Sequence, residues 1–386
     1  PTDSNTVYSA GFYGTIQRSD MATGETVGVV PQPEAGEPAF RGQWVAPFII
    51  SPHNPRIIYH GMCFLFRSMN RGDSWERISP DLTYNNPDNY GDIPYQTLFS
   101  IAESPFQFGQ IYVGTDDGRV WRTDDSGGNW HEINRGLPYG KWVAELVASK
   151  HVEGTVYMAQ NGKRDDDFMP YLWKSTDFGE NWTSIVANIP SGPINVIKED
   201  PQNPDLLYVG TDLGVYVSLN GGAEWHALPG GNLPSSFYQD LVIHPEEDIM
   251  VAATHGRGVW AMDVRPLQAM TPEVMSEPVH VFDPGTTQLP QGFRGAGGSA
   301  AIQYWVGSPA RQALIQIRDS SGSMVQEFSG PGEAGMQAVS WNLTRGTPPA
   351  EGQGGRARAV RVQPGTYSVI VTVGNASSQA EIVVVQ

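Results

Sequence analysis

Aspartates in turns between strand-like segments are the residues of this chain that could do chemistry. Hydrolysis of a glycosidic bond needs two carboxylic acids about 5 to 9.5 Å apart, one on each side of the bond. The catalytic candidates by residue type and turn position are Asp92, Asp116, Asp117, Asp166 and Asp212. Spacing along the chain places no two of them at that separation. Each also fits a plain β-turn, where Asp and Gly are favoured.

Aromatic and basic residues in the same kinds of segment form a second group. Aromatic rings stack on sugar or peptide groups, and arginine or histidine can hold an acidic group. Arg257 has a structural alternative, because it could pair with a nearby aspartate and lock its sheet. The ligand-binding candidates are Trp44, Tyr95, Trp142, Arg164, His255 and Arg257.

Metal and cofactor sites are not predicted. The run Asp165 to Asp167 could bind Ca²⁺, but three successive carboxylates lack the alternating spacing of a calcium loop, which favours a solvated loop. The sequence contains no His-Glu-x-x-His, no Gly-x-Ser-x-Gly and no glycine-rich phosphate loop before a helix. The common signatures of metalloproteases, serine hydrolases and nucleotide enzymes are therefore missing.

A repeated turn must position these side chains. The pattern Ser/Thr-x-Asp/Asn-x-Gly-x-x-Trp occurs four times, and each copy ends one strand-like run and opens another. The hydroxyl and the short carboxylate or amide can bond the backbone of a tight turn, Gly tolerates positive φ, and Trp packs on the sheet. We therefore predict an all-β array of similar units. The turn residues are Ser68, Asn70, Gly72, Trp75, Thr123, Asp125, Gly127, Trp130, Ser175, Asp177, Gly179, Trp182, Ser218, Asn220, Gly222 and Trp225.

This turn resembles the Asp-box, or BNR, repeat of sialidases, xyloglucanases and sortilin-type domains. The resemblance implies β-propeller blades, in which the box closes the hairpin between the third and fourth strands and lies away from the binding face. The candidates above then belong to the opposite face. The Arg-Ile-Pro motif of sialidases is not matched, because Arg56-Ile57-Ile58 lacks the proline. Xyloglucanase-type enzymes use two facing propellers, whereas this chain holds at most one.

Segments 51–55, 78–83, 166–171 and 253–260 extend the resemblance over nearly the whole chain. These segments resemble segments of large secreted bacterial proteins that are labelled sortilin-like (VPS10) or BNR-repeat glycosyl hydrolases. The stretch Pro364-Gly365-Thr366-Tyr367 resembles the C-terminal module of those proteins. In that family a propeller portion precedes the equivalent of Pro1, which implies that this chain is a C-terminal portion.

Three regions are predicted along the chain. Residues 1–265 hold five to six blades' worth of Asp-box β-propeller, with a first unit that lacks its leading strand and a last unit of three strands without a box. Residues 266–298, rich in proline and then glycine, predict a linker. Residues 299–386 predict an immunoglobulin- or fibronectin-like β-sandwich. The propeller could close as a small ring, but an uncovered edge at the N-terminus favours part of a larger one.

Composition excludes some partners. A net charge of −17 argues against nucleic acid and anionic lipid as partners. The sequence also contains no run of 18 apolar residues, the length needed for a helix that spans a membrane. We predict an extracellular or cell-envelope module that binds or scaffolds a protein, peptide or glycan. One alternative is a polysaccharide-active glycoside hydrolase that uses an Asp pair. Another is a structural subunit whose propeller edge pairs with an upstream segment or a partner chain.

Overall fold

The structure is a computed structural model that describes residues 3–91, 94–190, 192–228, 233–289, 298–346 and 360–386. Asp92 and the glycine-rich run 292–297 lie outside the described residues. The chain divides into two compact units, Pro1–Met262 and Asp263–Gln386. The buried cluster around Ile315 belongs to the second unit, and the clusters around Tyr59, Val143 and Val209 belong to the first.

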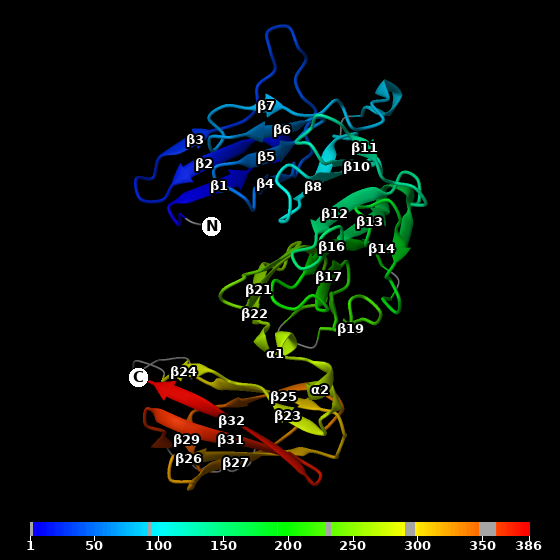
Figure 1. Cartoon of the computed structure of the whole chain (residues 1–386). Helices are drawn as coiled ribbons and strands as arrows, with labels where there is room; N and C mark the ends of the chain where they lie inside the picture. Colours follow the sequence, from blue (N-terminus) through cyan, green and yellow to red (C-terminus); the bar gives the residue numbers. More distant parts are fainter. Residues whose placement is uncertain (1–2, 92–93, 191, 229–232, 290–297, 347–359) are drawn as a thin grey trace. The chain divides into compact units, whose positions relative to one another are not determined.

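The first unit is a succession of antiparallel sheets, in each of which strands adjacent in sequence pair with one another (Figure 1). Each sheet is therefore a meander, with tight turns inside it and longer connections to the next sheet. The first sheet is three-stranded: β1 (Thr6–Ala10), β2 (Ile16–Asp20) and β3 (Thr26–Gly28), with the short helix η1 (Phe12–Gly14) between β1 and β2. The last sheet is also three-stranded: β20 (Tyr238–Ile243), β21 (Ile249–Thr254) and β22 (Val259–Asp263).

Four-stranded sheets lie between these two. Their strands are β4 (Phe48–Ile50), β5 (Ile58–Gly61), β6 (Leu65–Ser68), β7 (Glu76–Arg77); β8 (Leu98–Glu103), β9 (Ile111–Thr115), β10 (Val120–Thr123), β11 (His131–Glu132); β12 (Trp142–Ala148), β13 (Val156–Gly162), β14 (Asp167–Ser175), β15 (Thr183–Ser184); β16 (Ile194–Glu199), β17 (Leu207–Thr211), β18 (Val215–Ser218) and β19 (His226–Ala227). Two short helices, η2 (Pro87–Asn89) and η3 (Lys163–Asp165), lie in the connecting segments. No pairing among the described strands joins the first sheet to the last, so closure of a ring stays a prediction.

Each Asp box forms the turn between the third and fourth strands of a four-stranded sheet. In the first box, Ser68 Oγ donates to Asn70 Oδ1 at 2.9 Å and accepts from the amide of Gly72 at 2.8 Å. The same two bonds recur in the other three boxes. The four box glycines have φ between +89° and +98°, a region in which a side chain is strained. The local geometry thus accounts for the residue types of the motif.

The box also joins each sheet to the sheet before it. The indole Nε1 of Trp130 donates to the carbonyl oxygen of Ile78 at 3.0 Å, and a Cβ on Gly127 would lie 2.2 Å from that same oxygen. Ile78 itself lies three residues after the preceding box tryptophan, Trp75. Equivalent bonds of 2.7 to 2.9 Å run from Trp75 to Val29, from Trp182 to Ile133 and from Trp225 to Ile185. Each box is therefore a joint between consecutive sheets.

The second unit begins with two short helices, α1 (Arg265–Gln268) and α2 (Pro272–Ser276). One sheet has the order β23 (Val279–Val281), β25 (Ala300–Val306), β28 (Gly335–Trp341). Another has the order β24 (Thr286–Gln288), β32 (Ala376–Val385), β31 (Gly365–Val373), β26 (Ala313–Asp319), β27 (Met324–Gly330), and β29 (Thr344–Arg345) pairs with β30 (Val360–Arg361). Alternating residues of both larger sheets form one buried core, including Tyr304, Ile315, Trp341 and Val371.

The observed boundaries differ from the predicted ones. The segment 266–298, expected as a linker, contributes β23 and β24 to the sheets of the second unit, and that unit starts at Asp263. Both strands are only three residues long, and Pro278 and Pro284 stand just outside them. Hydrophobic alternation cannot be recognised over so short a run. An immunoglobulin- or fibronectin-like identity for these sheets stays a prediction.

Candidate functional site

The meander gives the first unit two different faces. Turns between first and second strands and between third and fourth strands open on one face, which we call the box face. A hydrogen bond of 3.0 Å from Ser126 N to Gly109 O joins two such turns. Turns between second and third strands, the connections between sheets and the strand ends beside them open on the other face. The first sheet starts at the equivalent of a second strand, so its β1–β2 turn also opens on this face, where His60 Nε2 at the end of β5 lies 2.9 Å from Gly14 O. We call this other face the connection face.

Exposed aromatic side chains gather on the connection face. Nine aromatic side chains among the described residues of the first unit are exposed. Two of them, Phe106 and Phe108, lie on the box face. The other seven lie on the connection face: Phe12, Tyr13, Trp44, Tyr84, Tyr90, Tyr139 and Phe168. Exposed apolar surface is common where a partner binds, so the connection face is the candidate contact surface.

Asp116 and Asp117 lie on this face but are buried, with only 1% and 2% of their surface exposed. Asp116 accepts from Thr97 N at 2.8 Å, from Thr97 Oγ1 at 2.9 Å and from Gln43 Nε2 at 2.6 Å. Burial raises the pKa of Asp116 to about 6 and raises the pKa of Asp117. With their oxygens turned inward, these two carboxylates hold loops together in this structure.

The loops held by the two carboxylates carry exposed rings. Gln43, which donates to Asp116, also accepts from the amide of Trp44 at 2.9 Å. Asp117 accepts from the amide of Tyr84 at 2.8 Å, and the Tyr84 ring lies 5.5 Å from that of Tyr139. Two predicted catalytic candidates thus position two aromatic loops.

The structure brings together Arg164, Tyr95 and Trp142, each of which was predicted separately as a ligand-binding residue. The Arg164 guanidinium lies 4.6 Å from the Tyr95 ring and 4.7 Å from the Trp142 ring, and it donates to Pro94 O at 3.1 Å. Cation–π contacts of this kind hold the guanidinium over the ring faces. Arg164 remains exposed and has no ion pair with a carboxylate among the described residues. It can therefore donate hydrogen bonds to a ligand.

The carboxylates beside Arg164 have different partners. Asp212 accepts from Lys163 Nζ at 2.7 Å and from Asn195 Nδ2 at 2.9 Å. Asp167 pairs with Lys141 at 2.8 Å, and this hydrogen bond leads the contacts that lower its pKa to about 2. Asp166 is exposed with φ of 54°. Of the described catalytic candidates, Asp166 is the most accessible to solvent.

The remaining ligand-binding candidates lie at the two ends of the sheet series. Trp44 is half exposed near the first sheet. His255 and Arg257 lie in the β21–β22 turn, where the His255 ring is 5.7 Å from the ring of Phe237. The structural alternative for Arg257, an ion pair with an aspartate, is not found among the described residues, and its side chain is exposed.

A partly buried ion triad on the leading strands, with Asp240 at its exposed end, was missed by the sequence reasoning. Lys198 of β16 contacts the carboxylate of Glu145 of β12 and lies 3.3 Å from that of Asp240 of β20. Burial opposes the charge on Lys198, but the two carboxylates outweigh it and raise the pKa of the ammonium. The triad ties three consecutive sheets together. These residues occupy ordinary strand positions, so only the register with neighbouring sheets reveals them.

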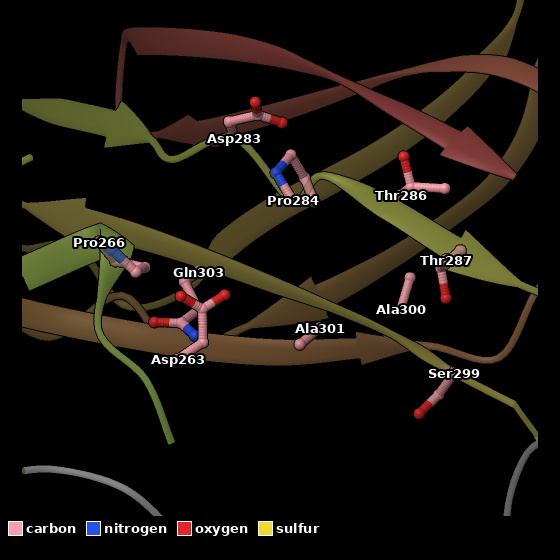
Figure 2. A pocket seen from close by; sticks show the side chains of 10 residues that line it. All are labelled: Asp263, Pro266, Asp283, Pro284, Thr286, Thr287, Ser299, Ala300, Ala301 and Gln303. Atoms are coloured by element: carbon pink, nitrogen blue, oxygen red, sulfur yellow. The ribbon is translucent and has the colours of Figure 1, made fainter. Parts of the chain in front are cut away.

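The second unit contains a small pocket of about 150 Å³ (Figure 2). Asp263 on its wall is bound by Arg265, whose Nε lies 3.0 Å from each carboxylate oxygen. Asp283 accepts from Gly285 N at 2.8 Å. The pocket is small and mostly polar, and its two acids already have partners. The lining residues are Asp263, Pro266, Asp283, Pro284, Thr286, Thr287, Ser299, Ala300, Ala301 and Gln303.

Within the described ranges, no three or more His, Cys, Asp or Glu side chains are grouped as metal ligands would be. No helix in the described part of the chain is long and apolar enough to cross a membrane.

Comparison with known proteins identifies the repeat and the fold. The family described as BNR-Asp box repeat matches residues 172–185. A xyloglucanase of Paenibacillus sp is 28% identical over 206 residues, which are 46% of this chain and 20% of the enzyme. The xyloglucanase Xgh74A of Acetivibrio thermocellus is 27% identical over 297 residues, 65% of this chain and 34% of the enzyme. The matched part thus spans a fifth to a third of these relatives.

A solved structure agrees with these matches. The GH74 xyloglucanase of Xanthomonas campestris superposes with a TM-score of 0.53 and 20% identity, covering 78% of this chain and 50% of that chain. Together the comparisons support an all-β, Asp-box repeat protein with a propeller-like fold.

Proposed function

Starting from an Asp-box, propeller-like array, we propose that the connection face of the first unit binds a polysaccharide. The observation that carries the proposal is the seven-to-two division of exposed aromatic side chains between the two faces. Aromatic rings stack on the flat C–H faces of sugars, while nearby polar groups bond to the hydroxyls. Arg164 supplies such donors beside Tyr95 and Trp142. Similarity to enzymes named xyloglucanases supports xyloglucan as the first ligand to test.

Binding is favoured over catalysis by the state of the carboxylates. Asp116 and Asp117 are buried and hydrogen-bonded, and Asp212 is paired with Lys163. A general acid or nucleophile must reach the glycosidic bond directly. The buried pair instead supports the loops of Trp44 and Tyr84, which is the role expected in a rigid binding surface.

The test is affinity electrophoresis of the full chain in gels that contain xyloglucan, another neutral glycan, an acidic glycan or none. Tyr139→Ala removes a ring that is 79% exposed on the connection face, and the matched control Phe106→Ala removes one that is 46% exposed on the box face. We expect Tyr139→Ala to weaken binding by about tenfold, as for a stacking contact worth ~1.4 kcal/mol. Phe106→Ala should bind like the parent. Absence of retardation by every glycan, or equal loss in both variants, would refute the proposal.

Hydrolysis is the second candidate, favoured by the matches to xyloglucanases. Its test is release of reducing ends from xyloglucan by the parent chain and by Asp166→Asn and Asp212→Asn. A hydrolase that uses either residue loses turnover in that variant while still being retarded in the gel. Retardation without any release of reducing ends by the parent leaves binding as the function.

Other parts of the hypothesis remain proposals. Polysaccharides of this kind lie outside cells, so an extracellular or cell-envelope location follows from the proposed ligand. The sortilin-like (VPS10) relationship and a scaffolding role toward a protein, a peptide or an upstream propeller segment stay predictions. Co-purification of a stoichiometric protein partner, with no glycan bound, would favour the scaffold.

A further inference from the structure

We infer that Phe12, Tyr13 and Trp44, which we call the aromatic corner, form the main pyranose-binding subsite of the connection face. This inference rests on the proposed polysaccharide binding and adds the position of the strongest contact. The three side chains are 66%, 54% and 50% exposed. The Phe12 ring lies 6.2 Å from the Tyr13 ring and 6.1 Å from the Trp44 ring, with interplanar angles of 52° and 66°. A sugar can therefore stack on one ring while its edge touches another.

The backbone of Tyr13 is held in a strained conformation. Its φ of 61° and ψ of 32° lie in the left-handed region, where a bulky side chain is a rare outlier outside turns that demand it. The residue lies in the β1–β2 turn, on the opposite face from the Asp boxes. Strain of this kind persists only where surrounding structure enforces it, and it is concentrated at functional sites. Here the strained residue presents a large ring to solvent.

Surrounding contacts fix both halves of the aromatic corner. The buried ring of His60 bridges the two halves, with Nε2 2.9 Å from Gly14 O and Nδ1 3.1 Å from Pro47 O. The backbone at Gly42 passes so close to the η1 turn that a Cβ would lie 2.5 Å from Tyr13 O. A backbone that is already fixed loses little entropy when a ligand binds, so these contacts favour affinity.

The chemistry of the aromatic corner fits a neutral sugar. Within the described residues, neither the Tyr13 hydroxyl nor the Trp44 Nε1 has a hydrogen-bond partner, and no ion pair involves the three residues. The site thus offers apolar ring faces together with two polar tips. A pyranose ring has the complementary pattern, C–H groups on its faces and hydroxyls at its rim.

The experiment measures binding of cellohexaose and soluble xyloglucan to the full chain by calorimetry and tryptophan fluorescence. The variants are Phe12→Ala, Trp44→Ala, Trp44→Phe and Tyr13→Asn, with Tyr139→Ala and Phe106→Ala alongside. We expect Trp44→Ala and Phe12→Ala each to weaken binding by more than the roughly tenfold expected for Tyr139→Ala. Trp44→Phe should abolish most of the ligand-induced fluorescence change while retaining most of the affinity.

Tyr13→Asn separates function from folding. Asparagine tolerates the left-handed region better than tyrosine, so the variant should unfold at a higher urea concentration than the parent and yet bind more weakly. Parent-like binding by all four variants, with Tyr139→Ala still weakened, overturns this inference and leaves the proposed function intact. No binding of either glycan by the parent overturns the proposed function. Binding of a proline-rich peptide instead of both glycans overturns the inference as well.

Discussion

The joint between sheets makes a quantitative prediction for Gly127→Ala. The new Cβ would lie 2.2 Å from Ile78 O, at a residue with φ of +98°. Positive φ costs alanine about 1 to 2 kcal/mol, and overpacking against a backbone atom costs about 1 to 3 kcal/mol more. Because Ile78 O also accepts from Trp130 Nε1, any shift that relieves the clash weakens that hydrogen bond as well. We expect a loss of roughly 3 kcal/mol in the free energy of unfolding.

Gly136→Ala is the matched control. Gly136 has φ of +82°, and a Cβ there would meet nothing within 4 Å. Gly136→Ala therefore introduces the backbone strain without the clash. It lowers the conformational entropy of the unfolded chain by the same amount as Gly127→Ala. Urea unfolding of the full chain followed by tryptophan fluorescence measures both, since nine of the eleven tryptophans lie in the first unit. If Gly127→Ala lowers stability no more than Gly136→Ala, the account of the box as a joint is wrong.

Three further variants test other contacts. Trp182→Phe keeps a ring but leaves Ile133 O without its 2.7 Å hydrogen bond, so urea unfolding should show that the free energy of unfolding falls by about 1 to 2 kcal/mol. Trp44 is half exposed, so the control Trp44→Phe should change the free energy of unfolding little. Asp116→Asn tests the buried carboxylate. With a folded pKa of about 6 against an ordinary value of 3.8, Asp116 binds its proton more tightly in the folded state, so its contribution falls as pH rises through that window, by up to about 3 kcal/mol. The stability difference between parent and Asp116→Asn should therefore drift from pH 4 to pH 7, and parallel curves contradict the assignment. Lys198→Met leaves the partly buried carboxylate of Glu145 without its ion pair and should lower the free energy of unfolding by about 1 to 3 kcal/mol, part of which Glu145→Leu in the same chain restores. Additive losses in the double variant argue against the ion triad.

The repeated turn could be predicted because its chemistry is local. Ser68, Asn70 and Gly72 meet their partners within four residues, so spacing alone encodes the hydrogen bonds. The same holds for the three-stranded first and last sheets, which follow from where the boxes and strand-like runs begin and end. The bond from Trp130 to Ile78 spans 52 residues and becomes visible only once the sheets are stacked.

The sequence predicts which types of residue lie in the candidate site better than it predicts the role of each residue. Arg164, Tyr95 and Trp142 were chosen separately by type and position, and the structure brings them into contact. Asp116 was chosen as a possible acid, yet its three hydrogen bonds come from Gln43 and Thr97, 73 and 19 residues away. Burial of a turn aspartate depends on such distant partners, and no local pattern encodes it. The strain at Tyr13 was hidden for a similar reason, because the segments that pack on its turn, at His60 and Gly42, are distant in the sequence.

The two faces of the first unit divide stability and recognition between them. On the box face, Trp130 and Gly127 lock one sheet to the next through contacts that tolerate few other residue types. On the connection face, contacts such as those of Gln43 with Asp116 and of Lys163 with Asp212 also join neighbouring segments. That face nevertheless carries groups that a fold selected for stability alone would avoid, such as the buried carboxylate of Asp116 and the strained, exposed Tyr13. Seven aromatic side chains are exposed on the connection face. A face with a purely structural role would be expected to bury such rings, so their exposure is the reason to look for a ligand there.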